Sequence, residues 1–350
     1  MFDPKIPFDI PLLPSNFNFN QVDILKLALK ANNALSKLNW LVLLLPNPEL
    51  LVKPLLSKES VESSAIENIF TTTQELLKAE TIDKNKIKWP EKEVVSYKEA
   101  LLYGFDFIKN NSFIHTNLLV NIWDIIEPNK WWIRKLPGTV IANSFWETIY
   151  TPPVWEVNIR NYLKNLEDFI NNFDDDIDPL IKAWVIHYQF ESIHPFYDWN
   201  WRTGRVLMVL YIVLAWKLDY PILFLSEYIN KNKTDYYKIL NNTSKTWDYK
   251  EIIIFILKAI EKQSEITAKK IIAINNLINE LNNKINDEKI VKFIFSNPFI
   301  SIKFMSENMW ITRQTASKYI KKLEWLHLLD SIDYSKTKLY FNPEFVKILS

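Results

Sequence analysis

Apolar residues recur at every third or fourth position along most of this 350-residue chain, which is the spacing of amphipathic helices. Strict alternation of apolar and polar residues, the signature of a half-buried strand, is rare. The pattern therefore predicts a mainly α fold. The helices expected from it cover residues 20–38, 58–69, 73–80, 93–109, 157–172, 179–193, 202–218, 233–242 and 249–282.

Two regions depart from this pattern. Between Lys135 and Pro153, one glycine and short β-branched stretches, closed by two prolines, predict a β-hairpin. Beyond Asp287, helices followed by a two-stranded ribbon are in the order typical of a winged helix-turn-helix. These elements are expected over residues 289–295, 302–309, 312–326 and 328–341.

The chain divides on this basis into four expected segments. They are an N-terminal region (residues 1–90), a helical core (91–265), a linker helix (266–286) and the winged helix-turn-helix (287–350). With 48% hydrophobic residues, a chain of this length can form two or three packed cores.

The composition excludes several classes of protein. The 42 basic and 41 acidic side chains nearly cancel, so no global field steers the chain to nucleic acid or to a membrane. The lack of cysteine excludes a disulfide framework and a thiolate metal site. The most apolar run, Val206 to Trp216, is far shorter than the roughly 20 residues of a membrane span, and the N-terminus has no signal-peptide pattern. We therefore expect a cytoplasmic protein.

The residues most informative about chemistry form one loop and the first turn of an apolar helix. The string HPFYDWNWRTGR, residues 194–205, contains a base, a carboxylate, an amide and two arginines. A helix N-terminus binds anions through its free N–H groups, and Arg202 and Arg205 are one turn apart, so both can grip phosphate oxygens. Asp198 is placed to hold Mg²⁺ against those phosphates, and His194 can accept a proton near neutral pH. His194 taken alone is better explained as a histidine packed at a helix end beside a surface loop, but the whole string favours one chemistry.

This string resembles the signature of the Fic family, His-Pro-Phe-x-(Asp/Glu)-Gly-Asn-Gly-Arg-x-x-Arg, at ten of its twelve positions. The resemblance implies a Fic-type helical bundle whose β-hairpin is a flap that aligns a target backbone by strand addition. It also implies that His194 deprotonates the target hydroxyl, that Asp198 binds the metal and that Phe196 anchors the loop in the core. The nucleotide-binding residues that it implies are Phe196, Trp199, Asn200, Trp201, Arg202, Thr203, Gly204 and Arg205, with Tyr236 and Tyr237 lining the adenine side.

A second motif lies upstream, in the helix expected over residues 58–69. Ser63, Glu67 and Asn68 match the family's inhibitory pattern, (Ser/Thr)-x-x-x-Glu-(Gly/Asn). By this resemblance Glu67 pairs with Arg205 and takes the place of the ATP γ-phosphate, so that ATP binds in an unreactive pose. The alternative interpretation of Glu67 is an ordinary glutamate on an amphipathic helix.

Trp199 and Trp201 occupy the two positions where the family has glycine. Glycine there lets bare N–H groups approach the phosphates, and another residue at such torsions costs about 1–3 kcal/mol. The chain has 3 glycines and 14 tryptophans, whereas average usage of about 7% predicts roughly 25 glycines.

We therefore hypothesise that the native gene reads the codon UGA as glycine, and that these codons appear here as tryptophan. Trp132, Trp146 and Trp310 stand at further positions suited to glycine. A degenerate Fic protein that has lost activity is the alternative.

The helix expected over residues 312–326 has the form of a recognition helix, with Thr312 as its cap. Its solvent-facing cations are expected to be Arg313, Lys318, Lys321 and Lys322. Such a basic stripe suits phosphate contacts with DNA, and a winged helix that docks on protein is an equal alternative.

The resemblance as a whole implies a Mg²⁺-dependent protein adenylyltransferase, which moves AMP from ATP to a Ser, Thr or Tyr hydroxyl of a protein, with its own chain as one option for the target. Two alternatives that the resemblance leaves open are the reverse reaction, in which water removes AMP, and the transfer of another phosphate-containing group. The alternative from a different class is a catalytically degenerate Fic protein that binds nucleotide without turnover and acts as a DNA-binding regulator. A homodimer is one option for the assembly, and no membrane partner is expected.

Overall fold

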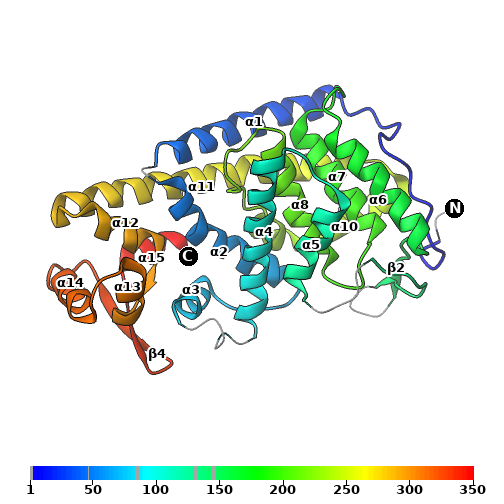
Figure 1. Cartoon of the computed structure of the whole chain (residues 1–350). Coiled ribbons are helices and arrows are strands. Elements are labelled where there is room, and N and C mark those ends of the chain that lie inside the picture. The colour runs from blue at the N-terminus through cyan, green and yellow to red at the C-terminus, as the bar shows by residue number, and fades with distance from the viewer. Residues whose placement is uncertain (1–2, 46, 83–86, 88, 129–132, 143–146) are drawn as a thin grey trace. The chain divides into compact units, whose positions relative to one another are not determined.

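The computed structural model describes the chain apart from residues 1–2, 46, 83–86, 88, 129–132 and 143–146 (Figure 1). The described residues are mainly helical, which confirms the predicted fold class. They form two compact units, one of residues 1–36 and 99–264 and the other of residues 37–98 and 265–350. Three helices run from one unit into the other: α1 (Val22–Leu43), α4 (Glu91–Asn111) and α11 (Lys250–Ile285).

Two buried helices form the centre of the first unit. They are α7 (Pro179–Ile193) and α8 (Asn200–Leu214), which pack against each other along their lengths. A helix that is apolar around its whole circumference must be covered on every side. In the green part of Figure 1, α6 (Glu156–Asn171) lies beside α7, while α5 (Thr116–Ile126) packs on α8. The short helices α9 (Ser226–Lys231) and α10 (Lys233–Thr246) follow.

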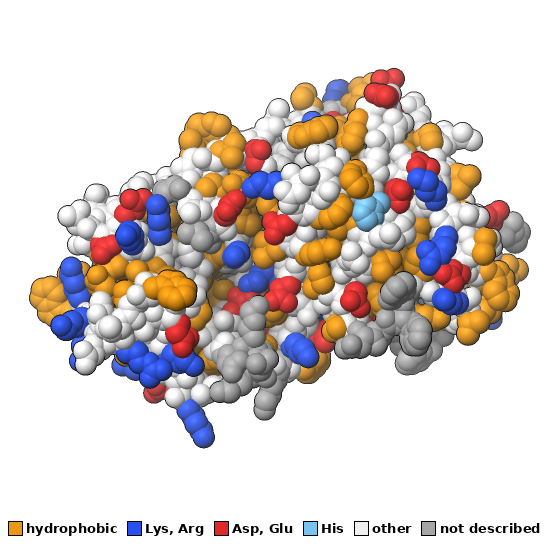
Figure 2. Space-filling view, viewed as in Figure 1, with side chains coloured by type: hydrophobic (Ala, Val, Ile, Leu, Met, Phe, Trp, Pro, Cys, Tyr) orange, Lys and Arg blue, Asp and Glu red, His pale blue; other side chains and the backbone are white. Residues whose placement is uncertain are grey.

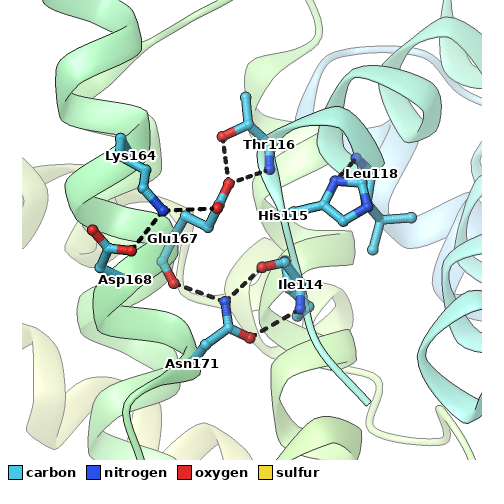
Figure 3. Close-up of polar contacts among 8 residues, drawn as sticks. All are labelled: Ile114, His115, Thr116, Leu118, Lys164, Glu167, Asp168 and Asn171. Carbon is cyan, nitrogen blue, oxygen red and sulfur yellow. Dashed lines mark hydrogen bonds and ion pairs between the residues drawn. The ribbon is translucent and has the colours of Figure 1, made fainter. Parts of the chain in front are cut away.

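A cluster of polar contacts fixes the start of α5 against α6 (Figure 3). The side chain of Asn171 bonds to both the N–H and the carbonyl of Ile114, at 3.1 and 2.7 Å. Glu167 accepts hydrogen bonds from the N–H and the hydroxyl of Thr116, at 2.8 and 3.0 Å. His115 caps α5, because its Nδ1 accepts from the N–H of Leu118. The pattern of apolar residues did not predict α5, and a histidine cap is not one of the usual helix-start signals.

The expected hairpin between Lys135 and Pro153 is confirmed. Strand β1 (Ile141–Ala142) pairs antiparallel with β2 (Thr148–Tyr150), with Ile141 opposite Tyr150. The N-terminal segment also bonds to this region, since the N–H of Phe8 donates to the carbonyl of Thr151 at 3.0 Å.

The second unit combines residues 37–98 with the C-terminal residues 265–350. Its N-terminal helices are α2 (Pro48–Ile66) and α3 (Thr73–Thr81). Its C-terminal elements are α12 (Glu288–Ser296), β3 (Phe299–Ile300), α13 (Ile302–Met309), α14 (Arg313–Trp325), β4 (Asp330–Tyr334), β5 (Thr337–Phe341) and α15 (Pro343–Leu349). The strands form an antiparallel sheet in the order β3-β5-β4.

Helix α2 packs against α12 and α15, and α3 packs against β3. The hydroxyl of Thr81 donates to the carbonyl of Phe299 at 3.0 Å, and the ammonium of Lys78 lies 5.9 Å from the ring centre of Phe299. Elements that are more than 200 residues apart in the chain therefore share one core, and periodicity alone does not reveal such a pairing.

Several expected boundaries differ from the observed ones. Helix α2 begins at Pro48 rather than near residue 58, and it accommodates Pro54 inside it. The sequence pattern did not predict α9, β3 or α15, each of which is shorter than eight residues. Elements this short offer too few positions to show a period.

Five of the tryptophans that the structure describes have the left-handed backbone torsions that favour glycine. They are Trp155, Trp199, Trp216, Trp247 and Trp310, with φ between 53° and 71°. For an L-residue this conformation is less stable than the right-handed one by about 1–2 kcal/mol. Of the glycine-suited positions named above, Trp201 is helical, and Trp132 and Trp146 lie outside the described residues.

Trp310 shows the helix ending that glycine usually provides. It follows α13 at φ 56°, and the N–H of Ile311 returns to the carbonyl of Ser306 at 3.1 Å. The next residue after a helix is most often glycine in this arrangement. Packing of the indole offsets little of this torsional strain, because 94% of the Trp310 surface is exposed.

Replacing Trp310 by glycine should raise the free energy of unfolding by about 1 kcal/mol, because the strain of the left-handed torsion is removed. Denaturant unfolding of the purified chain measures the change. Trp325→Gly is the matched control: this residue is also well exposed but has helical torsions in α14. Glycine should destabilise the chain there by about 0.5–1 kcal/mol, and equal effects at the two sites would contradict the strain argument.

Candidate active site

His194 ends α7 and begins the loop that leads to α8. Its backbone is left-handed, with φ 49° and ψ 59°, and its N–H bonds to the carbonyl of Phe190 at 3.0 Å. A non-glycine residue in this conformation is uncommon, and such residues cluster at functional sites. Burial and the nearby charge of Arg134 lower the pKa of His194 from 6.5 to about 3. The imidazole is therefore neutral at physiological pH and can accept a proton.

The loop after His194 is held in shape by Phe196 and Asn200. The Phe196 ring is buried and stacks on Trp123 of α5, with ring centres 4.7 Å apart, as expected of a core anchor. The Asn200 side chain accepts from the N–H of Phe196 and donates to its carbonyl, both at 2.9 Å. The resemblance implied a phosphate contact for Asn200, whereas in this structure its amide closes the loop.

Asp198 lies at the exposed side of the same loop. One carboxylate oxygen accepts from the N–H of Trp199 at 2.8 Å, and the backbone carbonyl accepts from the indole of Trp123 at 3.0 Å. Among the residues that the structure describes, no three histidine or carboxylate side chains come together as metal ligands. A Mg²⁺ ion at Asp198 would therefore take its other oxygen ligands from phosphate and water, which is common for this ion.

The N-terminus of α8 carries the two arginines and both tryptophans. Trp199 has φ 61°, and its ring centre lies 4.1 Å from the guanidinium carbon of Arg202. Arg202 and Arg205 are both buried. The indole of Trp199 therefore covers a cation that was expected to grip phosphate.

Trp201 differs from Trp199 in its backbone torsions, and this corrects the expectation that both positions need the torsional freedom of glycine. It belongs to α8 and has helical torsions, so the torsional argument for glycine holds at Trp199 alone. The remaining argument for glycine at position 201 is that the indole fills space, since its ring centre lies 6.3 Å from that of Tyr236 and 6.4 Å from that of Tyr237. The structure thus places the tyrosine pair of α10 beside the start of α8.

Thr203 and Gly204 face the interior of the first unit. The hydroxyl of Thr203 donates to the carbonyl of Trp199 at 3.1 Å. A Cβ atom on Gly204 would lie 2.1 Å from a carboxylate oxygen of Glu191 and 3.0 Å from Nδ1 of His187. Glycine at this position allows α8 to approach α7, so both residues shape the site through packing.

His187 is a buried titratable residue that the motif analysis did not single out. It lies on α7, where burial, and secondarily the charge of Arg205, lower its pKa from 6.5 to about 3. The signal available in the sequence was its position within an apolar helix two turns before His194.

The two buried histidines predict a loss of stability in acid. The unfolded chain binds protons at these histidines as the pH falls through 6.5, whereas the folded chain binds them only near pH 3. The free energy of unfolding is then highest above pH 6.5 and should fall by about 1.4 kcal/mol per pH unit for each histidine between pH 6 and 4. Denaturant unfolding at a series of pH values measures this slope, and His187→Asn should reduce it by one histidine's share. An unchanged slope in that variant would contradict the assignment.

The motif that resembles the family's inhibitory pattern lies in the second unit, at the end of α2. Ser63 is buried within the helix, while Glu67 and Asn68 form the turn that ends it. Asn68 has φ 61°, and the N–H of Ile69 returns to the carbonyl of Ser64 at 3.1 Å. This left-handed position accounts for the choice of glycine or asparagine at the last place of the motif.

The four expected cations of α14 are exposed, and Ile320 and Leu323 are buried, as the pattern predicted. Thr312 caps the helix by accepting from the N–H of Thr315 at 3.2 Å. Figure 2 shows Lys and Arg side chains gathered over α13, α14 and the β4–β5 ribbon.

Across the described parts of the chain, none of the helices combines the length and the apolar character that a membrane span needs.

Comparisons with known proteins place this geometry in a family. Sequence models described as Fic/DOC family N-terminal, Fic/DOC family, and protein adenylyltransferase SoFic-like C-terminal domain match residues 25–106, 114–212 and 272–345. The loop from His194 to α8 lies within the second match. The chain belongs to the Fic/DOC family.

Curated relatives and solved structures agree with this assignment. The chain is 26% identical over 208 residues to a Nematostella vectensis protein named protein adenylyltransferase Fic, covering 57% of this chain and 46% of the relative. It is 27% identical over 140 residues to the Caenorhabditis elegans protein adenylyltransferase fic-1, covering 39% of this chain and 26% of the relative. The chain thus spans less than half the length of either relative.

The fold is shared with a crystal structure of a Fic family protein from Desulfovibrio desulfuricans G20. The TM-score is 0.61 at 17% identity, over 94% of this chain and 97% of that one. Fic-1 of C. elegans gives a TM-score of 0.54 at 18% identity, over 71% of this chain and 70% of that one.

Proposed function

We propose that the chain is a protein adenylyltransferase that moves AMP from ATP to a Ser, Thr or Tyr hydroxyl. The observation that carries the proposal is His194, a buried and neutral imidazole at the end of α7, joined by a short rigid loop to the N-terminus of α8. A base beside an anion-binding helix end is what such a transfer needs. The names of the curated relatives support the same reaction.

In this reaction the hydroxyl oxygen of the target attacks the α-phosphorus of ATP. The bond between that phosphorus and the oxygen that bridges to the β-phosphate breaks, and pyrophosphate leaves. His194 takes the hydroxyl proton, and Arg202 and Arg205 bind phosphate oxygens. Mg²⁺ at Asp198 would neutralise phosphate charge. The target backbone would align on the β1–β2 hairpin.

Self-inhibition through Glu67 and a winged helix-turn-helix at the C-terminus are further parts of the proposal. The first rests on the motif at the end of α2, and the second on the order α12, α13, α14 and β4–β5 with its exposed cations.

A second candidate function is a nucleotide-binding, DNA-binding regulator without turnover. The stacking of Trp199 on Arg202 favours it for the chain with tryptophan at this position, because the indole occupies space that phosphate needs.

Incubation with Mg²⁺ and either α-labelled or γ-labelled ATP, with the chain and a cell lysate as targets, tests the proposal. Transfer of AMP fixes the α label to protein and releases the γ label with pyrophosphate. Fixation of the γ label would indicate a kinase-type transfer instead. If neither label is fixed even with glycine at 67, 199 and 201, the second candidate is favoured.

A further inference from the structure

The last turn of α7 ends in backbone carbonyls that receive hydrogen bonds from the hairpin segment. Helix ends leave such carbonyls without partners inside the helix. Here the hydroxyl of Tyr150 donates to the carbonyl of Ser192 at 3.0 Å. Arg134 donates to the next three carbonyls: its Nη2 to that of Ile193 at 3.1 Å, its Nε to that of His194 at 2.6 Å, and its backbone N–H to that of Pro195 at 2.9 Å. Four successive carbonyls are therefore bound by the segment that carries the hairpin.

The guanidinium of Arg134 is fully buried and also reaches the far end of the hairpin segment. Its Nη2 donates to the carbonyl of Pro153, which follows β2. Burial lowers the pKa of Arg134 to about 10, so the group stays charged at neutral pH. A positive charge is favourable at a helix C-terminus, where the backbone dipole is negative.

We propose that Arg134 is a positioning residue that holds the β1–β2 hairpin and the backbone of His194 in one fixed geometry. If the hairpin aligns the target strand, this connection sets the distance between the target hydroxyl and the imidazole. This role rests on the proposed transferase function. Sequence reasoning missed it, because the bonded carbonyls lie about 60 residues further along the chain.

The charge of Arg134 has a second effect on His194. The elements around the imidazole carry Arg134 before the hairpin, Lys182 and Glu191 on α7, Asp198 in the loop, and Arg202 and Arg205 on α8. After burial, the charge of Arg134 contributes most to lowering the pKa of His194, against the backbone carbonyl of Glu191, which raises it. Loss of the guanidinium should therefore move the pKa of His194 back towards its ordinary value.

The test compares Arg134→Met, Arg134→Lys and the control Arg160→Met, each combined with glycine at 67, 199 and 201. Arg160 is an exposed arginine of α6 that pairs with Glu156. With Arg134→Met we expect kcat to fall by about 100-fold, the cost of a small misplacement of a reacting group, while the KM for ATP stays within about twofold. Arg134→Lys should recover part of kcat, and Arg160→Met should change neither constant.

NMR of the His194 imidazole, followed down to the lowest pH at which each chain stays folded, gives a readout that needs no transfer activity. The proposal predicts that Arg134→Met raises its pKa, that Arg134→Lys raises it less, and that Arg160→Met leaves it unchanged. An unchanged imidazole pKa together with an unchanged kcat in Arg134→Met would overturn the proposal, as would a fall in kcat matched by an equal rise in the KM for ATP. If the parent transfers no AMP, the function fails, while a raised pKa in folded Arg134→Met still supports the connection between Arg134 and His194.

Discussion

Glycine at positions 199 and 201 should raise AMP transfer by about 10- to 100-fold over the chain with tryptophan at both. At position 199, glycine lets bare N–H groups approach the phosphates, and each 1.4 kcal/mol of transition-state binding that this adds corresponds to a factor of ten in rate. It also uncovers the guanidinium of Arg202, which now lies under the indole. At Trp201, the change opens space beside Tyr236 and Tyr237. Label transfer from α-labelled ATP measures the rate.

The two single variants separate the uncovering of Arg202 from the opening of space beside the tyrosine pair. Trp199→Gly should give most of the gain, because it frees a phosphate-binding guanidinium, whereas Trp201→Gly only opens space next to Tyr236 and Tyr237. Trp216→Gly is the matched control: this residue has φ 53° and is 75% exposed beyond the other end of α8. It should stabilise the chain without changing transfer. Equal transfer by all variants and the parent would show that the loop tolerates indoles.

Removing the carboxylate of Glu67 should raise transfer by about 10- to 100-fold in the chain with glycine at 199 and 201. The resemblance assigns this carboxylate the place of the ATP γ-phosphate opposite Arg205. A charge-assisted hydrogen bond contributes about 1.5–3 kcal/mol, and its loss would release ATP into the reactive pose. Glu67→Gln tests the charge while keeping the shape, and Asn68 keeps the left-handed turn that ends α2.

Glu62→Gln is the control for this prediction. Glu62 lies on the same helix, directly before Ser63, the first residue of the motif. It should leave transfer unchanged, whereas an equal gain from both variants would point to a general loosening of α2. No gain from Glu67→Gln would contradict self-inhibition through this residue.

The sequence predicted those elements well whose start signals are local. The bounds of α7 and α13 agree with the prediction, since Asp178 and Pro179 mark the start of the first and Ser301 caps the second. It could not predict that α2 packs against α12 and α15, because that contact joins distant parts of the chain.

The same limit applies to the candidate site. The motif identified His194, Asp198 and the arginines from their order. It did not show that Asn200 closes the loop on Phe196 or that Arg134 binds the carbonyl of His194. Those roles depend on where folding brings backbone carbonyls and amides, which residue types alone do not determine.

The backbone torsions of the tryptophans bear directly on the codon hypothesis drawn from the sequence. The shortage of glycine led to the codon hypothesis, and the structure adds left-handed torsions at Trp155, Trp216 and Trp247, positions that the sequence had not singled out. Left-handed torsions at so many residues of one bulky type favour the hypothesis over random degeneration. A native gene that encodes position 199 with UGG would contradict it.

The central claim is that His194 is the base in a transfer of AMP, and one comparison tests it most directly. The chain with glycine at 67, 199 and 201 is incubated with α-labelled ATP and Mg²⁺, with and without His194→Ala. The account predicts protein-bound label with His194 and a loss of at least about 100-fold with alanine. Equal labelling of both chains would contradict it.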